Sequence, residues 1–334
     1  MSKQWTADAI LELARSYQSP CVLAAAAELD LFGPLGAGGS TAGEAAAKLR
    51  CDERAMTVLL DALAALELIR KTGERYMLPE ATIPLLAAGG PASVVAMVRH
   101  QANCLRRWAQ LAKVVRTGQP AGREPSLRGE EADMQSFIGA MHVVSEPIAD
   151  EVVGHLRPLA WTRVLDIGGA SGTWTAALLR ARPESSAILF DLPEVIPLAR
   201  KRLAGKGLTD RVQLVAGDYL QDELPGGADL AWISAIVHQN SRVENRRLFA
   251  AARRALQRGG HVAIRDIVME PSRTAPAAGA LFAINMFVAT PGGGTFTFDE
   301  LRADLEEAGF TDVTCARRDP GMNSLVTART RADA

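Results

Sequence analysis

The sequence predicts an α/β fold in which a Rossmann-like, doubly wound sheet follows a mainly helical winged-helix domain. From Trp161 onward, strand-like and helix-like segments alternate, as they do in parallel sheets. The stretch "VLDIGGASGTW" at 164–174 places a glycine-rich turn between the first of these strands and a helix. Near the end of the chain, "FTDVTCARR" and "NSLVTAR" are separated only by a short turn. That pair predicts a C-terminal antiparallel hairpin at the edge of the sheet.

Length, charge and cysteine content limit the classes of protein to consider. The chain has 334 residues, 48% of them hydrophobic, which is enough for one large domain or two ordinary ones. Its formal net charge of −1 indicates neither nucleic acid nor an anionic membrane as a partner. The cysteines are scattered without a CxxC pair, so we expect no metal cluster, no disulfides and a reducing, cytoplasmic location. They are Cys21, Cys51, Cys104 and Cys315.

Two uncharged runs raise the question of a membrane span. Residues 81–98 contain Pro84 and the run Gly89-Gly90-Pro91, which break a helix. Residues 277–290 are too short to cross a bilayer, so we predict a buried helix there. The N-terminus lacks the apolar segment of a signal peptide. The sequence therefore predicts no membrane association.

The first half of the chain is predicted to be helical. An alanine- and leucine-rich helix covers residues 6–30. Thr41, with Glu44 three positions further on, forms a capping box for the next helix, and Asp52 caps the one after it. A two-stranded wing follows around Thr72-Gly73. Helix, helix and wing together predict a winged-helix domain.

Winged helices commonly bind DNA, but the charges of this one argue against that role. Between residues 40 and 80 there are six basic and seven acidic side chains, so the basic face that phosphates require is missing. Leucines along the second helix are suited to packing against protein. We therefore interpret the domain as a dimerisation module, and salt-sensitive binding to a DNA duplex would support the alternative of a regulator. The leucines are Leu59, Leu60, Leu63, Leu66 and Leu68.

Further helices and the strands of the sheet complete the predicted elements. Helices are expected at 93–118 and at about 133–156, with a loop at 119–132 between them. The predicted strands are "RVLDI", "AILFD", "VQLVAGD", "ADLAWIS" and "HVAIRDIV". We divide the chain into a winged-helix domain at 1–90, a helical connector at 91–157 and the sheet domain at 158–334.

Acidic residues at the strand ends indicate which ligand the glycine-rich turn holds. Asp166 lies two positions before Gly168, where its carboxylate would repel a pyrophosphate and favour an ammonium or sulfonium group. Ala170 stands where a middle glycine is common. Asp191 ends the next strand, where an acid can accept both ribose hydroxyls, and Asp218 follows the strand after it. Three carboxylates without a phosphate-binding basic residue favour S-adenosylmethionine over NAD.

At this point the chain resembles a known family. "VLDIGGASG", "FDLP", "GDYL" and "ALQRGGHVAIRDIV", in that order, are similar to class I S-adenosylmethionine-dependent methyltransferases. With the winged helix, "RRWAQLAKVVRTGQP" and "ATPGGGTFTFDELRADLEEAGF", nearly the whole chain resembles the plant phenolic and bacterial natural-product O-methyltransferases, of the caffeate, acetylserotonin and anthracycline type. The resemblance implies methyl transfer to a hydroxyl of a small, aromatic molecule, with no metal. It also implies a homodimer joined through the N-terminal domain, whose connector helps to close the substrate pocket.

The resemblance also implies which residues hold the cofactor, whose product is S-adenosylhomocysteine. Two glycines pass its methionine and ribose, one acid binds the ribose, and an acid with a neighbouring tyrosine lies on the adenine side. We expect cofactor contacts from Asp166, Gly168, Gly172, Asp191, Leu192, Asp218, Tyr219 and Ser234.

Methyl transfer is an in-line displacement, so the protein must align the acceptor and remove its proton. A phenol has a pKa of about 10, which a neighbouring histidine can overcome as general base. Of the five histidines, His238 follows the strand "ADLAWIS" at the face where ligands bind in such sheets, and it matches the catalytic histidine of the family. Asp266 stands where the family has a glutamate, and we expect it to orient the imidazole.

Two departures from the family pattern leave alternatives open. Gln239 stands where the family commonly has an aspartate after the histidine, and Thr295 lies near the place of a second glutamate. The acceptor could be an acidic phenol or enol that needs little help, or a carbon or nitrogen atom. A non-methylating reaction, such as a hydroxylation or a rearrangement, is the other alternative.

The substrate pocket is predicted from residues on helices that the family places over the active site. Their methionine and phenylalanine side chains could grip a flat ring or could equally belong to the core. Two asparagines in apolar company could bond the acceptor. The expected set is Phe137, Met141, Asn240, Phe282, Asn285 and Met286.

Overall fold

The computed structural model describes residues 4–36, 38–87, 90 and 92–331, and the chain divides into two compact units. The first unit contains residues 1–106 and 123–143, and the second contains residues 107–122 and 144–334. The residues of the predicted connector contribute to both units. Each unit is described by itself below.

The first unit is helical, with a small antiparallel sheet ordered β1-β3-β2. Its core is made by side chains of α2, α3, α4 and the wing, among them Leu60, Leu63 and Tyr76. The predicted capping box is present, since Thr41 accepts from the Glu44 N–H at 3.2 Å and Glu44 accepts from the Thr41 N–H at 2.8 Å. The elements are α1 (Ala7–Arg15), α2 (Gln18–Glu28), β1 (Ser40–Thr41), α3 (Ala42–Leu49), α4 (Glu53–Ala65), β2 (Arg70–Thr72), β3 (Arg75–Met77), α5 (Ile83–Leu86), α6 (Val95–Trp108) and α8 (Glu130–Ser145), the last two of which end in the second unit.

Three predicted helices are each interrupted once. The first breaks where Ser16 bonds back to the Leu13 carbonyl through both its N–H and its hydroxyl. The second ends at Trp108 and resumes as α7 (Leu111–Thr117). The third, predicted from about 133, begins at Glu130 and stops before Pro147, which has no N–H to donate.

An apolar face is left exposed along α1. Every residue of this helix is at least partly exposed, and Ile10, Leu11 and Leu13 have 55%, 50% and 59% of their surface exposed. Trp5 and Tyr17 flank them and are equally exposed. By contrast, Leu60 and Leu63 of α4 lie in the core of the unit itself. The larger exposed apolar surface is therefore on α1, while Leu66, just after α4, also leaves 37% of its surface exposed.

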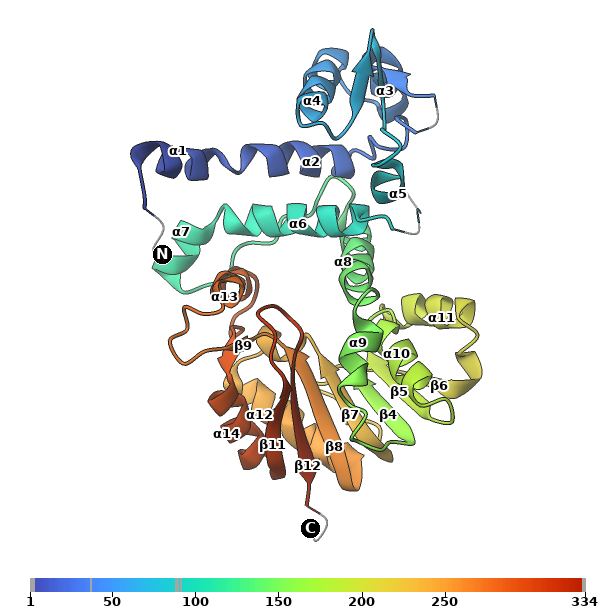
Figure 1. Ribbon diagram of the computed structural model, residues 1–334, viewed down its shortest axis with the longest axis vertical. Helices are drawn as coiled ribbons and strands as arrows, with labels where there is room; N and C mark the ends of the chain where they lie inside the picture. The colour runs from blue at the N-terminus through green and yellow to red at the C-terminus, as the bar shows by residue number, and fades with distance from the viewer. Residues whose placement is uncertain (1–3, 37, 88–89, 91, 332–334) are drawn as a thin grey trace. The chain divides into compact units, whose positions relative to one another are not determined.

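The second unit contains a seven-stranded sheet ordered β11-β12-β8-β7-β4-β5-β6 (Figure 1). The strands from β8 to β6 in this order are parallel, and the β11–β12 hairpin pairs antiparallel with β8 at the edge, as predicted. The order changes direction between β4 and β7, where open α/β sheets bind their ligands. The elements are α7, α9 (Ala149–Gly154), β4 (Arg163–Ile167), α10 (Thr173–Ala181), β5 (Ser186–Asp191), α11 (Ile196–Gly205), η1 (Thr209–Arg211), β6 (Val212–Ala216), β7 (Ala228–Ser234), η2 (Val237–Gln239), α12 (Arg242–Ala255), β8 (Leu256–Asp266), β9 (Val268–Met269), α13 (Ala277–Ala289), β10 (Phe296–Thr297), α14 (Phe298–Glu307), β11 (Phe310–Arg317) and β12 (Ser324–Thr330).

Helices cover both faces of this sheet. On one face, α12 and α14 pack through Leu248, Phe249 and Leu301. On the other face, α9 and α10 pack against Trp232 and its neighbours, and α11 lies beside α10. Because side chains alternate along a strand, each buried strand supplies both cores.

Two features of the second unit bear on the membrane question. The segment predicted as a buried helix is α13, but Leu281 and Phe287 have 61% and 37% of their surface exposed in the single chain. None of the helices in the described part of the chain has the length and apolar character that a bilayer span requires.

The glycine-rich turn connects β4 to α10 in a tight left-handed path. Gly168 and Gly172 have φ angles of +70° and +78°, and a Cβ at Gly168 would stand 2.5 Å from the Ile236 side chain. Ala170, in the middle of the turn, has φ +48°, a left-handed conformation that its Cβ disfavours. The turn is therefore strained at the one position where alanine replaces glycine.

We expect Ala170→Gly to raise the free energy of unfolding by about 0.5–1 kcal/mol, because relief of the left-handed strain exceeds the added entropy of the unfolded chain. Gly172→Ala is the matched control in the same turn, and it should lower that free energy by about 1–2 kcal/mol. Its new Cβ would also lie 3.0 Å from Leu203. Urea unfolding followed by circular dichroism measures both changes, and the same sign for the two variants would contradict the strain.

Candidate active site

The three predicted acids lie at the carboxyl edge of the sheet. Asp166 is on β4, Asp191 ends the neighbouring β5, and Asp218 follows β6, which pairs with β5. The parallel pairing of these strands therefore brings the three carboxylates to the same edge.

Asp166 is buried and bonded to the helix that follows the turn. Its Oδ2 accepts from the Thr175 hydroxyl at 2.5 Å, and only 1% of the residue is exposed. Burial raises the pKa of Asp166 to about 7, and the negative charge of Asp191 acts in the same direction. A cation placed beside this carboxylate would favour its ionised form.

Asp191 joins the end of β5 to the glycine-rich turn. One carboxylate oxygen accepts from the Ala170 N–H and the other from the Leu192 N–H, each at 2.7 Å. Burial raises the pKa of Asp191, while these two hydrogen bonds oppose the change. Each oxygen keeps a further lone pair for a ligand. Leu192 leaves 40% of its surface exposed next to this carboxylate.

Tyr219 is connected to the catalytic candidate through a chain of amides. Its hydroxyl donates to Asn240 Oδ1 at 3.1 Å, Asn240 Nδ2 donates to Asn245 Oδ1 at 3.1 Å, and Asn245 Nδ2 donates to the Val237 carbonyl at 3.0 Å. Burial raises the pKa of Tyr219 to about 12, so the phenol stays protonated and keeps its donor. Each end of the Asn240 amide has one partner inside the protein, and one N–H and one lone pair remain, so its contact with a substrate stays a prediction.

Asp218 has local hydrogen bonds of its own. It accepts from the Leu220 N–H at 2.9 Å and from Gln221 Nε2 at 2.7 Å. These bonds stabilise the turn after β6 and hold its carboxylate next to Tyr219.

His238 and Asp266 form a buried pair. The ring nitrogen Nδ1 lies 2.8 Å from Asp266 Oδ1 and 3.0 Å from Oδ2, and the His238 N–H donates to Oδ2 at 3.2 Å. The two residues are 6% and 3% exposed. With Nδ1 engaged in this way, Nε2 is the nitrogen available to a ligand.

The loop after α13 packs against the turn that carries His238. The Gly294 N–H donates to the His238 carbonyl at 2.9 Å, and a Cβ at Gly293 would stand 2.6 Å from the same oxygen. Phe282 of α13 meets the imidazole edge to face, with ring centroids 4.8 Å apart. Thr295 is buried, and its carbonyl accepts from Arg273 at 3.0 Å. This loop and α13 thus fix the surroundings of the imidazole.

The other predicted substrate residues lie in different environments. The Oδ1 atom of Asn285 accepts from Trp108 Nε1 at 2.9 Å, and this hydrogen bond fixes the orientation of the amide group. Met286 is buried beside it on α13. Phe137 and Met141 lie on α8 in the first unit, where Phe137 packs 5.1 Å from the His100 ring. The predicted contact of these residues with a substrate stays a prediction.

Our sequence reasoning missed one buried charge at this edge, Arg265 on β8. Its guanidinium donates to the predicted cofactor residue Ser234 at 3.2 Å and lies 4.5 Å from the Trp174 ring centre. An arginine inside the apolar strand "HVAIRDIV" was the visible signal.

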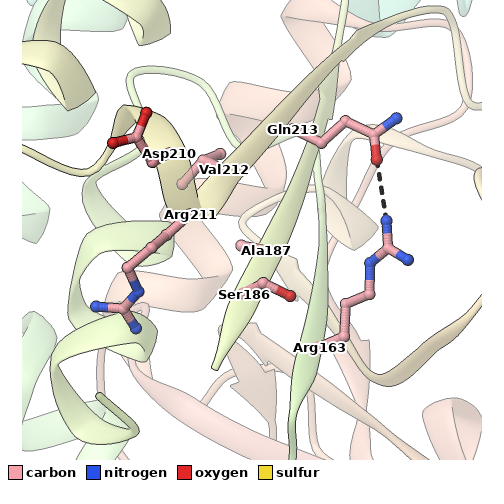
Figure 2. A pocket seen from close by; sticks show the side chains of 7 residues that line it. All are labelled: Arg163, Ser186, Ala187, Asp210, Arg211, Val212 and Gln213. Carbon is pink, nitrogen blue, oxygen red and sulfur yellow. Dashed lines mark hydrogen bonds between the residues drawn. The ribbon is translucent and has the colours of Figure 1, made fainter. Parts of the chain in front are cut away.

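A hollow of about 300 Å³ lies at the opposite end of the sheet, where β4, β5 and β6 begin (Figure 2). Arg163 there donates to Gln213 at 2.9 Å, and Arg211 donates to main-chain carbonyls. The predicted site residues do not line this hollow. It is lined by Arg163, Ser186, Ala187, Asp210, Arg211, Val212 and Gln213. Among the described residues, no group of three or more His, Cys, Asp or Glu side chains is placed to hold a metal.

Comparison with known proteins shows which domains the chain contains. Residues 108–311 match the model of an O-methyltransferase domain, and residues 11–83 match an O-methyltransferase dimerisation domain. The chain is 30% identical to 3-hydroxy-5-methyl-1-naphthoate 3-O-methyltransferase of Streptomyces sahachiroi, over 95% of this chain and 93% of that protein. It is 31% identical to the tetracenomycin polyketide synthesis 8-O-methyl transferase TcmO of Streptomyces glaucescens, over 91% of both.

A solved structure supports the same fold. Human N-acetylserotonin methyltransferase in complex with SAM is 23% identical, with a TM-score of 0.82 over 99% of this chain and all of that one. The matched domains cover both units, and the two bacterial relatives span nearly the whole chain. The chain therefore belongs to the S-adenosylmethionine-dependent O-methyltransferases of the plant phenolic and bacterial natural-product family.

Proposed function

We propose that this enzyme methylates a hydroxyl group on a small aromatic natural-product-like molecule, with His238 as the general base. The observation that carries the proposal is the buried His238–Asp266 pair, which lies at the same carboxyl edge as Asp166 and Asp191. A base and a set of acids for a cationic cofactor are the two components that the reaction requires.

The residues at this edge fit the cofactor. S-Adenosylmethionine supplies a methyl group on a positively charged sulfur and also carries an ammonium group and a ribose. Asp166 provides a buried carboxylate on the side of α10, and Asp191 has lone pairs left for ribose hydroxyls. Tyr219 presents a ring beside Asp218 for the adenine. Gly168 and Gly172 leave two positions of the turn without a side chain.

His238 would act on the acceptor through Nε2. Because Asp266 accepts from Nδ1, the free ring nitrogen is an acceptor and can take a proton from a hydroxyl. The carboxylate then stabilises the imidazolium that forms, and its bond to the His238 N–H keeps the turn in place. The Phe282 edge limits the rotation of the ring.

The substrate class is inferred from the relatives and from α13. The two bacterial relatives are named for a naphthoate and for a tetracenomycin polyketide, both with O-methylation in the name. Phe282 and Met286 provide apolar surface near the base, and Asn285 offers an amide whose Nδ2 can donate to a substrate oxygen. An aromatic hydroxyl compound of polyketide type fits these groups.

We also propose that the chain forms a homodimer through the exposed apolar face of α1. The match to the dimerisation domain covers residues 11–83, which begin within α1. Ile10, Leu11 and Leu13 of this helix each leave half or more of their surface exposed. Burying such a face in a symmetric contact would remove this apolar surface from water.

The first prediction from this proposal concerns the cofactor. Asp191→Ala should weaken S-adenosylhomocysteine binding at least about tenfold, because charge-assisted hydrogen bonds to the ribose are lost. Titration calorimetry measures the change. Glu194→Ala, an exposed acid three positions away, is the control and should bind as the wild type does. Equal affinity in the wild type and Asp191→Ala would exclude the ribose role.

The second prediction concerns the base. His238→Ala should keep cofactor affinity and lose a factor on the order of 10²–10⁴ in turnover at pH 7 with a phenolic substrate. Raising the pH should recover part of the rate, because the acceptor then ionises without a base. Asp266→Asn should be milder in the same direction. His155→Ala, an exposed histidine, is the control. Turnover of His238→Ala within threefold of the wild type would point to an acceptor that arrives ionised, or to a carbon or nitrogen nucleophile.

The third prediction concerns assembly. The wild type should sediment at twice the 35.6 kDa chain mass, and Ile10→Glu with Leu13→Glu should give the single chain, because two buried charges per subunit oppose association. Val243→Glu, an equally exposed apolar position on α12, should remain dimeric. A dimer that survives the double change in α1 would place the interface elsewhere.

A further inference from the structure

Arg265 is a buried cation at the ligand edge of the sheet. Of the arginines and lysines in the described part of the chain, it alone is fully buried, with 4% of its surface exposed. It lies on β8 directly opposite Ser234 of β7. A buried charge of this kind is costly unless something compensates it.

The protein partners of Arg265 are neutral. Nε and Nη2 donate to Asn323 Oδ1 at 2.9 and 2.7 Å, and Nη1 donates to Ser234 Oγ at 3.2 Å. Within the described residues no carboxylate forms an ion pair with it. A guanidinium has five N–H groups, so two remain for another acceptor. The side chain is held in position without an ion pair, and only the more distant charges of Asp266 and Asp319 favour its charged form.

The surroundings of Arg265 point to the glycine-rich turn. Its guanidinium lies 4.5 Å from the ring centre of Trp174, which stacks in turn on Trp232 at 5.3 Å. Trp174 is the second residue of α10, immediately after the turn that ends at Gly172. The N-terminus of this helix adds a partial positive charge at the same place.

We propose that Arg265 binds the carboxylate of the methionine part of S-adenosylmethionine. This inference rests on the proposed function and assigns a residue to the one anionic group of that cofactor. The acids at this edge match its sulfonium, ammonium and hydroxyl groups, and Arg265 supplies the single buried positive charge. Asn323 and Ser234 accept three of the five N–H groups and fix the orientation of the guanidinium.

The neighbouring acid does not fill this role. Asp266 follows Arg265 in the strand, so the two side chains leave β8 on opposite faces. Its oxygens accept from the His238 N–H, from the His238 ring and from the Ile267 N–H. Burial lowers the pKa of Arg265 to about 10, which leaves the group protonated at neutral pH.

The experiment compares two ligands that differ only in the carboxylate, S-adenosylmethionine and decarboxylated S-adenosylmethionine. Titration calorimetry on the full chain should show that the wild type prefers the carboxylated ligand about 10- to 100-fold. In Arg265→Met this preference should disappear, because the first ligand loses affinity and the second does not. Arg265→Lys keeps the charge and should restore part of the preference.

A matched control separates this effect from a general loss of structure. Arg211→Met removes a partly buried arginine bonded to carbonyls at the far end of the sheet, and it should leave the preference unchanged (Figure 2). The proposal is overturned if Arg265→Met keeps the preference, or if both ligands lose affinity equally. If Arg265→Met does not fold, the other proteins still test the proposal. It is overturned if the wild type or Arg265→Lys binds the two ligands with equal affinity. A wild type that binds neither ligand contradicts the proposed function itself.

Discussion

The candidate site depends on one hydrogen-bonded pair, because Asp266 holds His238 by both its main chain and its ring. The carboxylate accepts from the His238 N–H at 3.2 Å and lies 2.8 Å from Nδ1, so the turn and the ring orientation are fixed together. The carbonyl of the same histidine accepts from Gly294, and Gly293 approaches it more closely than any side chain would allow. The loop after α13 therefore packs directly against the main chain of the turn that carries His238.

The charges at this edge show a second constraint. Asp166 and Arg265 are both buried on the α10 face, yet each is bonded to neutral groups, a threonine hydroxyl in one case and Asn323 with Ser234 in the other. Burying two unpaired charges of opposite sign costs stability. A zwitterionic ligand that brings both signs would offset that cost, so ligand binding and the stability of this unit are linked.

Local patterns allowed much of the fold to be predicted, and long-range pairing explains what was missed. The alternation of strands and helices, the Thr41 capping box and the C-terminal hairpin depend on neighbouring residues, and the structure contains all three. The break after Ser16 has no strong local signal. The position of Arg265 beside Asn323 depends on β12 pairing with β8, which brings together residues 58 positions apart. No local pattern reports which face of a strand meets such a partner.

The segment after His238, where the sequence departs from the family pattern, is held by side-chain amides in this structure. Gln239, which stands where the family commonly has an aspartate, donates through its amide to the Ala235 carbonyl at 3.0 Å. The next residue, Asn240, links the Tyr219 hydroxyl to Asn245, which donates to the Val237 carbonyl one residue before His238. A neutral network needs no desolvated charge, so it can stabilise the turn without competing for the imidazole. Asp266 then remains the carboxylate that bonds the ring. Three hydrogen bonds therefore connect the Tyr219 hydroxyl to the main chain next to His238.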